Sequence, residues 1–99
     1  MIKYLENENL NDVIKDEIWI VDFYADWCGP CKMLMPILED IDFVNVVKVN
    51  VDNFPDIATK LGIMSIPTLC FYKDGELKER FIGFKTLDEI TAEYEKIAN

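Results

Sequence analysis

Histidine is absent from this 99-residue sequence. Its absence excludes serine or cysteine nucleophiles that are activated by a histidine base, and every metal site with a histidine ligand. Any proton acceptor in this chain must therefore be an aspartate, glutamate, lysine, tyrosine or cysteine side chain.

Basic residues are also few: ten lysines and arginines stand against 19 aspartates and glutamates, for a net charge of −9. An acidic surface repels phosphate backbones and favours solubility, so no nucleic-acid partner is expected. Long apolar runs are missing as well. The run Ile-Trp-Ile-Val at residues 18–21 is too short for a secretory signal or a membrane span. We therefore expect a soluble, cytoplasmic protein with no membrane association.

The chain has enough apolar material for one hydrophobic core. Hydrophobic residues make up 51% of the sequence and aromatic residues 12%, so disorder is not expected and no disulfide staple is needed for folding. We expect a single domain over residues 1–99, and a monomer. The three cysteines are an odd number, which argues against a framework of disulfides. In a reducing compartment, cysteines are more often catalytic or metal-binding than structural.

Alternating strand and helix patterns predict an α/β domain. Strands are expected over residues 2–5, 18–24, 44–51, 68–72 and 77–82, with a hairpin turn at 73–76. Helices are expected over residues 8–15 with Asn7 as the cap, over 31–41, over 55–61, and from a capping box at 86–89 to residue 98. The predicted order is β-α-β-α-β-α-β-β-α, a central mixed sheet of about five strands flanked by four helices.

The most specific motif is Trp-Cys-Gly-Pro-Cys-Lys at residues 27–32, between a predicted buried strand and a helix. Two residues between cysteines at a helix start bring the sulfurs close enough to bond. Free N–H groups and the macrodipole at the helix N-terminus are expected to lower the pKa of the Cys28 thiol. Pro30 suits the first helical turn. Cys31, further inside the helix, is expected to be more buried and less reactive.

A Cys-x-x-Cys pair is also found as half of zinc and iron–sulfur sites. Zinc needs four ligands, but this chain has no second pair, and only Cys70 remains, inside a predicted strand. We therefore expect a redox role for the pair, with no metal and no cofactor. Cys70 is expected to be a core residue.

Residues 21–32, Val-Asp-Phe-Tyr-Ala-Asp-Trp-Cys-Gly-Pro-Cys-Lys, resemble the signature segment of the thioredoxin family. Further matches follow in the family's order at residues 48–52, 63–68 and 71–75, and at Gly83. The resemblance covers nearly the whole chain. It implies the thioredoxin fold and an oxidoreductase that reduces protein disulfides, an electron carrier in cell redox homeostasis. Its partners would be disulfide-containing substrate proteins and a thioredoxin reductase.

The resemblance also implies a mechanism. Cys28 attacks a substrate disulfide, and Cys31 then attacks Cys28, which leaves a redox-active Cys28–Cys31 disulfide. Asp22 is the one charge in an apolar strand, where burial would raise its pKa. It falls where the family keeps a buried aspartate, and it is expected to exchange a proton with Cys31. Lys48 falls where the family has a lysine near that aspartate.

Other predicted site residues surround the cysteines. Gly29 and Pro30, between the two cysteines, are expected to support them. The family has a cis-proline at the position of Pro67, facing the cysteines, with the preceding backbone pairing with substrate. Trp27, Ile66 and Gly83 would then line a flat apolar patch around Cys28.

The sequence departs from the family's pattern at several places. Tyr24 replaces a common tryptophan, a change expected to alter fluorescence more than chemistry. The stretch between Cys31 and Lys48 is several residues shorter than usual. Met64 and Ser65 replace a charged residue and a glycine, so substrate and reductase preference are expected to differ. Two alternatives remain open: an oxidant or isomerase of the same superfamily, and a binding subunit that uses this surface as a scaffold.

Overall fold

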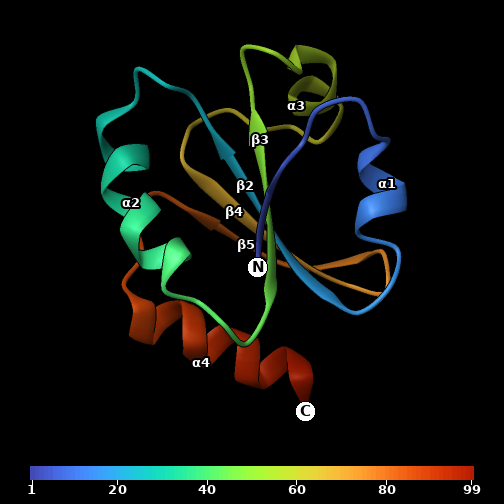
Figure 1. The fold of residues 1–99 in the computed structure, drawn as a ribbon, viewed down its shortest axis with the longest axis vertical. Helices are drawn as coiled ribbons and strands as arrows, with labels where there is room; N and C mark the ends of the chain where they lie inside the picture. The colour runs from blue at the N-terminus through green and yellow to red at the C-terminus, as the bar shows by residue number, and fades with distance from the viewer.

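The computed structural model describes all residues, Met1–Asn99, and its elements follow the predicted order (Figure 1). The strands are β1 (Ile2–Tyr4), β2 (Ile18–Tyr24), β3 (Asn45–Asn50), β4 (Thr68–Lys73) and β5 (Glu76–Ile82). The helices are α1 (Leu10–Val13), α2 (Gly29–Glu39), α3 (Pro55–Lys60) and α4 (Leu87–Ala98). None of these helices has the length and apolar character that a membrane crossing requires.

The five strands form one mixed sheet in the order β1-β3-β2-β4-β5, which confirms the predicted architecture. Strands β1, β3 and β2 are parallel, whereas β4 is antiparallel to β2 and β5 is antiparallel to β4. Because β2 and β4 are antiparallel neighbours, the carboxyl end of β2 and the amino end of β4 meet at the same edge of the sheet. The cysteine motif and Pro67 therefore lie at one common edge.

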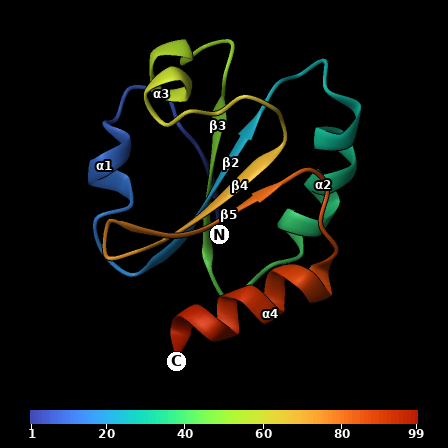
Figure 2. The ribbon, with the colours of Figure 1, turned by 180° about the vertical axis from the view of Figure 1, so that it is seen from behind.

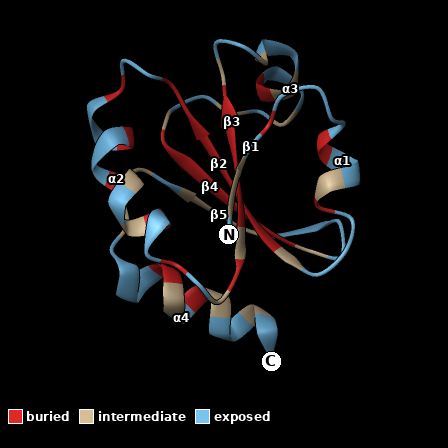
Figure 3. Ribbon diagram, in the orientation of Figure 1, coloured by how far each residue is buried: buried red, intermediate tan, exposed pale blue.

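Alternate side chains of the strands build a core on each face of the sheet. Val21 and Phe23 of β2 pack on the face that is covered by α1 and α3. Ile20 of β2 packs on the opposite face, against α2 and α4. Figures 1 and 2 show these helix pairs on opposite sides of the sheet, and Figure 3 shows the buried strands between exposed helix surfaces. Each fully buried Val, Ile, Leu or Phe side chain contributes about 1.5–3 kcal/mol to stability.

The first helix is shorter than predicted. It was expected over residues 8–15 with Asn7 as its cap, but it spans only Leu10–Val13 and Asn9 is the cap. The Asn9 side chain accepts a hydrogen bond from the Asn11 N–H at 2.9 Å. Before it, a hydrogen bond from the Glu6 N–H to the Glu8 carboxylate stabilises a turn. The backbone of Asn9 itself is extended, with φ of −78° and ψ of 125°, so the helix begins only after it.

Helix α2 begins two residues earlier than predicted, at Gly29 instead of Cys31. Cys28 is its N-cap, and the Cys28 sulfur accepts the backbone N–H of Cys31 at 3.3 Å. Pro30 fits the first turn because the N–H that proline lacks has no helical partner there. The early start fixes Cys28 at the helix N-terminus and places Cys31 in the first turn.

Two predicted local signals in the second half of the chain are confirmed. Asp74 and Gly75, with φ of 51° and 83°, form the β4–β5 turn. Asp-Gly is favoured in this type of hairpin because both residues need positive φ. The capping box of α4 is also present: Thr86 Oγ1 accepts the Glu89 N–H at 3.2 Å, and Glu89 Oε1 accepts the Thr86 N–H at 3.0 Å.

Candidate active site

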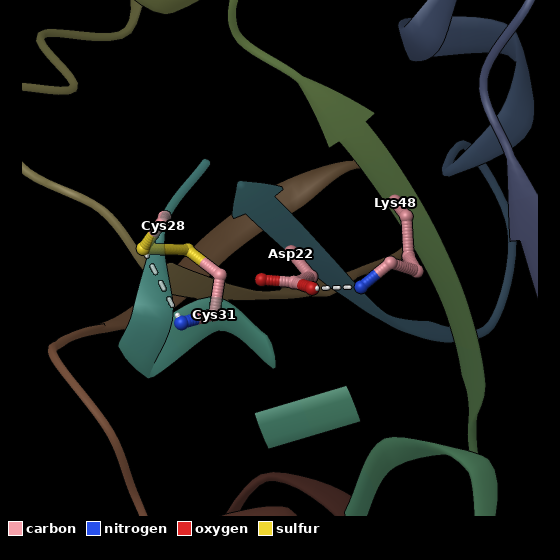
Figure 4. A network of polar contacts seen from close by, with 4 residues as sticks. All are labelled: Asp22, Cys28, Cys31 and Lys48. Carbon is pink, nitrogen blue, oxygen red and sulfur yellow. Dashed lines mark hydrogen bonds and ion pairs between the residues drawn. A yellow bond between two sulfur atoms is a disulfide. The ribbon is translucent and has the colours of Figure 1, made fainter. Parts of the chain in front are cut away.

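The two cysteines of the motif are joined as a disulfide at the start of α2 (Figure 4). Their Cα atoms are 5.2 Å apart, within the range that a disulfide requires. Cys28 is 5% exposed and Cys31 is 3% exposed. The predicted difference in burial is therefore very small in this oxidised state. The two sulfurs differ instead in the groups that surround them.

Cys28 faces the loop before β4. Its sulfur lies 3.8 Å from the carbonyl oxygen of Ile66. The Ile66–Pro67 peptide bond is cis, as the resemblance implied. The Thr68 hydroxyl donates to the Ser65 carbonyl at 2.7 Å, and the Gly83 N–H donates to the Pro67 carbonyl at 2.8 Å. These contacts fix the loop beside the disulfide.

Asp22 lies under the cysteine pair, on the α2 face of β2. It is fully buried, as predicted, and its Oδ2 accepts a hydrogen bond from Lys48 Nζ at 2.7 Å. The Lys48 side chain is fully buried as well, so this is an ion pair without solvent contact. Cross-strand register explains it, because Asp22 of β2 pairs directly with Lys48 of β3.

The second carboxylate oxygen of Asp22 has no hydrogen-bond partner. Asp22 Oδ1 is the one buried side-chain polar atom of the protein in this condition. Figure 4 shows Asp22 between Lys48 and the cysteine pair, with one oxygen toward Lys48 and the other toward the cysteines. Burial raises the pKa of Asp22 above its ordinary value of 3.8, and the charge of Lys48 only partly offsets this shift.

Trp27 is 70% exposed. Its indole N–H donates to Asp52 Oδ2 at 2.9 Å. Asp52 follows β3, so this bond joins the ends of two neighbouring strands. Ile66 is half-buried and Gly83 is partly exposed, so both can contribute to a surface beside Cys28.

The two residues between the cysteines are exposed. A Cβ added to Gly29 would meet no atom within 4 Å, so no steric requirement for glycine exists there. The exposed Pro30 occupies the first turn of α2. Both residues leave the backbone around Cys28 open to a partner.

The sequence did not predict that the lysine of the Asp22–Lys48 ion pair also contacts aromatic rings. The Lys48 ammonium lies 4.4 Å from the centroid of the Tyr24 ring and 6.0 Å from that of Tyr4. Tyr24 therefore contacts the buried charge, where the sequence predicted a greater effect on fluorescence than on chemistry. Asp52 was missed too, although Lys-Val-Asn-Val-Asp had been recognised as a family match. Both contacts depend on strand register, which the linear sequence does not display.

Cys70 lies outside this site. It is fully buried in the core on the opposite face of the sheet, as predicted, and it is not in a disulfide. Burial raises the pKa of its thiol above the ordinary value of 9.0, and Arg80 on β5 partly counters the shift. A buried, protonated thiol is inert toward disulfides.

The surface hollows are modest in size. A cleft of about 250 Å³ lies beside Cys31 and is also lined by Tyr24, Ala25 and Met35. A larger hollow of about 440 Å³ lies at the far end of the sheet, near Ile18 and Tyr94, away from the cysteines. No three side chains of the kinds that bind metals converge anywhere. The geometry thus offers a disulfide beside an open surface, with no deep pocket for a small substrate.

Comparisons with known proteins agree with this geometry. The family model described as thioredoxin matches residues 1–96. The thioredoxin of Chlamydia caviae is 43% identical over 94 residues, which cover 91% of this chain and 92% of the relative. That of Staphylococcus saprophyticus is 41% identical over 95 residues, 91% of each chain.

A solved thioredoxin variant from Halobacterium salinarum superposes with a TM-score of 0.87 at 33% identity, covering 96% of this chain and 88% of the other. Its similarity extends the sequence matches to the three-dimensional fold. With a Cys-x-x-Cys disulfide at the expected helix start, these matches show that the chain belongs to the thioredoxin family and is a thiol–disulfide oxidoreductase.

Proposed function

We propose that this protein works as a reductant of protein disulfides and that Cys28 makes the first attack. In the dithiol state, the Cys28 thiolate attacks one sulfur of the substrate disulfide, a new S–S bond forms, and the other substrate sulfur leaves as a thiolate. The position of Cys28 supports this role, because its sulfur sits at the N-terminus of α2 beside the Ile66 carbonyl. The helix N-terminus favours a negative charge on sulfur.

Cys31 completes the cycle in this proposal. Its thiolate attacks the Cys28 sulfur, the Cys28–substrate bond breaks, and the second substrate sulfur leaves. Two electrons pass to the substrate, whose disulfide becomes two thiols, while Cys28 and Cys31 form the disulfide seen here. Reduction of this disulfide by a thioredoxin reductase restores the starting state.

Asp22 accepts the Cys31 proton during the second step. One observation carries this assignment: the buried Oδ1 of Asp22 has no partner and points toward the cysteines (Figure 4). Its pKa is raised by burial, and a carboxyl group with a raised pKa is a better proton acceptor than one with the ordinary value. Lys48 supports the role by pairing with the other oxygen and fixing the carboxylate.

The proposed substrate surface comprises Trp27, Ile66 and Gly83, with Pro67, which is buried, in the loop directly behind Ile66. Trp27 offers an exposed ring, and the loop at Ile66 offers backbone groups beside Cys28. An extended substrate segment would pair with this backbone as an added strand does. Gly29 and Pro30 support the pair by leaving its outer side uncovered.

We further propose a monomer with one domain over residues 1–99 that acts in the cytoplasm. The two cores share one five-stranded sheet, which supports a single folding unit. A reducing compartment suits a disulfide reductant, because its dithiol must be maintained by a reductase. Gel filtration and cell fractionation test these two points.

Reduction of insulin disulfides, driven by candidate reductases, tests the proposed direction of transfer. We expect turnover with the wild type and none with a Cys28→Ser/Cys31→Ser variant. The reduction potential separates reductant from oxidant: a reductant lies at or below the glutathione pool, on the order of −220 to −260 mV, and oxidants or isomerases lie near −120 to −180 mV. A partner that still binds the double-serine variant at full affinity would favour the scaffold alternative.

The proton-transfer role of Asp22 has its own test. We expect Asp22→Asn to slow the Cys31 step by about 10²-fold, the usual contribution of a positioned base, and to change the Cys28 attack much less. Stopped-flow mixing of the dithiol protein with a disulfide substrate resolves the two steps. Equal rates for wild type and variant in the second step would remove Asp22 from the reaction.

Trp27 is expected to depend on Asp52 for its orientation. Replacing Asp52 by alanine removes a hydrogen bond to a charged acceptor, a loss of about 1.5–3 kcal/mol if the bond were fully buried and less at this exposed position. We expect KM for a protein disulfide to rise several-fold, with kcat little changed. Asp56→Ala, an exposed carboxylate in the first turn of α3, is the matched control. Equal KM values for both variants would show that the bond is dispensable.

A further inference from the structure

The buried cation at the centre of this site is in unusual surroundings. Lys48 is 1% exposed, and its ammonium has a single hydrogen-bond partner, Asp22 Oδ2. An ammonium carries three donors and is costly to bury without further stabilisation. The structure shows what occupies the rest of its environment: an aromatic ring on β2 and, further away, one on β1.

Sheet register creates this arrangement. Tyr4, Lys48 and Asp22 occupy directly paired positions on β1, β3 and β2. Tyr24, two residues after Asp22, lies on the same face of β2, where its ring centroid is 4.4 Å from Lys48 Nζ. The Tyr4 ring packs edge-on against Tyr24 at 6.3 Å between centroids. Cations are attracted to aromatic ring faces at such distances, most strongly where water is excluded.

Tyr24 also packs near the two cysteines. It packs in one buried cluster with Ala25, Cys28 and Cys31, and it lines the cleft beside Cys31. Tyr24 is only 9% exposed, and its ring is 4.4 Å from the Lys48 ammonium. The same ring therefore touches the cysteine pair and the buried lysine.

We propose that Tyr24 is a positioning residue whose ring holds the Lys48 ammonium against the Asp22 carboxylate and thereby sets how readily that carboxylate takes a proton. The proposal rests on the role of Asp22 given above. It assigns the ring, and not the hydroxyl, as the acting part. Tyr24 makes no covalent contact with substrate in this scheme.

Other charged and titratable groups around Asp22 are few. Lys48 pairs with it from β3, Tyr4 of β1 lies beyond Lys48, Cys31 lies beside it on α2 (Figure 4), and its neighbour on β4 is the apolar Leu69. On α4, which covers the same face, the buried carboxylate is Glu93, and it pairs with Lys96. Asp26 lies further along the chain, beyond Tyr24. Burial, followed by the charge of Asp26, raises the pKa of the Tyr24 phenol above 10.0, so the hydroxyl stays neutral throughout an acid titration.

Removing the Tyr24 ring should shift the titration midpoint of Asp22 in a defined direction. Without it, the Lys48 ammonium loses a stabilising contact and its fixed position, so its hold on the Asp22 carboxylate weakens. The carboxylate then binds its proton more tightly, and its titration midpoint rises. If the ring acted only by excluding water, its removal would admit water to the carboxylate and the midpoint would fall. The sign of the shift therefore distinguishes a positioning role from a sealing role.

The experiment is a carbon-13 NMR titration of the Asp22 carboxyl carbon in the disulfide form, in which neither Cys28 nor Cys31 titrates. We compare wild type, Tyr24→Phe and Tyr24→Leu. Tyr24→Phe keeps the ring and should titrate like wild type. Tyr24→Leu should move the midpoint upward by about half a pH unit to one pH unit, as expected from a desolvated cation–ring contact. Tyr4→Leu, whose ring is further from Lys48, should give a smaller shift of the same sign.

Two further measurements exclude a merely structural effect. Pentafluorophenylalanine incorporated at position 24 keeps the shape of Phe but removes the negative ring face, so it should reproduce the upward shift even if Tyr24→Leu folds poorly. In a Lys48→Met background, Tyr24→Leu should produce no additional shift, because the cation is gone. An unchanged or lowered midpoint in the ring-free variants, or a full shift without Lys48, would overturn the proposal. These titrations do not depend on turnover, so they remain decisive even if Asp22→Asn leaves the Cys31 step unaffected.

Discussion

Replacing Cys28 by serine is expected to abolish disulfide reduction, with a loss on the order of 10³-fold or more. The attacking thiolate is then missing, and a serine hydroxyl has no base to activate it in a chain without histidine. Replacing Cys31 by serine should instead stop the cycle halfway. Cys28 would still attack, but no second thiol would release the substrate, so a covalent complex accumulates.

Non-reducing electrophoresis and mass spectrometry measure this complex. The Cys31→Ser protein should migrate as a substrate adduct that dithiothreitol removes. Cys70→Ala is the matched control, because Cys70 is buried on the other face of the sheet and should not affect trapping. An adduct formed through Cys31 in the Cys28→Ser protein would reverse the assignment of the two roles.

Asp22→Asn is expected to gain stability relative to wild type as pH rises above 3.8, the ordinary pKa of an aspartate carboxyl group. Below the ordinary carboxyl pKa of 3.8, Asp22 is protonated in both folded and unfolded chains and contributes no pH dependence. Above it, the unfolded chain releases the proton while the folded protein retains it, because burial raises the folded pKa. Wild type therefore loses stability between the unfolded and folded pKa values, and the amide variant does not. Urea denaturation at several pH values measures the difference in unfolding free energy between wild type and Asp22→Asn.

Lys48→Met should have the opposite effect at neutral pH. It leaves Asp22 buried without its cation. Removing one partner of a buried pair costs up to about 3–5 kcal/mol, and less where the carboxyl group takes up a proton instead. Replacing both partners, as Asp22→Leu/Lys48→Met, should recover most of this loss, because apolar side chains of similar volume replace such pairs at little cost. A stability difference between wild type and Asp22→Asn that stays constant with pH would show that burial does not raise the pKa of Asp22.

Local sequence signals predicted the elements whose boundaries depend on neighbouring residues. The β-branched and aromatic run of β2 gave its bounds, Ile18–Tyr24, without error. The turn at Asp74–Gly75 and the Thr86 capping box were equally local. The first helix was placed wrongly because asparagines at residues 7, 9 and 11 can all act as caps, and Asn9 is the one whose extended backbone and side-chain hydrogen bond cap the helix.

The site was predictable where the motif itself carries the chemistry. Cys28 and Cys31 lie three residues apart, and the burial of Asp22 follows from its apolar strand. By contrast, the contact between the Tyr24 ring and Lys48 joins residues 24 positions apart in the sequence. The hydrogen bond from Trp27 to Asp52 joins residues 25 positions apart. Such contacts depend on how β2 aligns with β3, and no local pattern encodes that alignment.

The hairpin turn at Asp74–Gly75 has a practical consequence for engineering the molecule. It closes the end of β4 opposite to Thr68, so about 20 Å of strand separate it from the reactive sulfurs. Backbone and side-chain bonds to Glu17 anchor the turn at 2.9 Å, independently of the cysteine loop. A guest peptide inserted between Asp74 and Gly75 would lengthen a surface loop at an entropic cost of only about 0.6 kcal/mol per doubling of its length. We therefore expect that added segments at the Asp74–Gly75 end of the sheet would leave disulfide exchange at the Cys28 end unaffected.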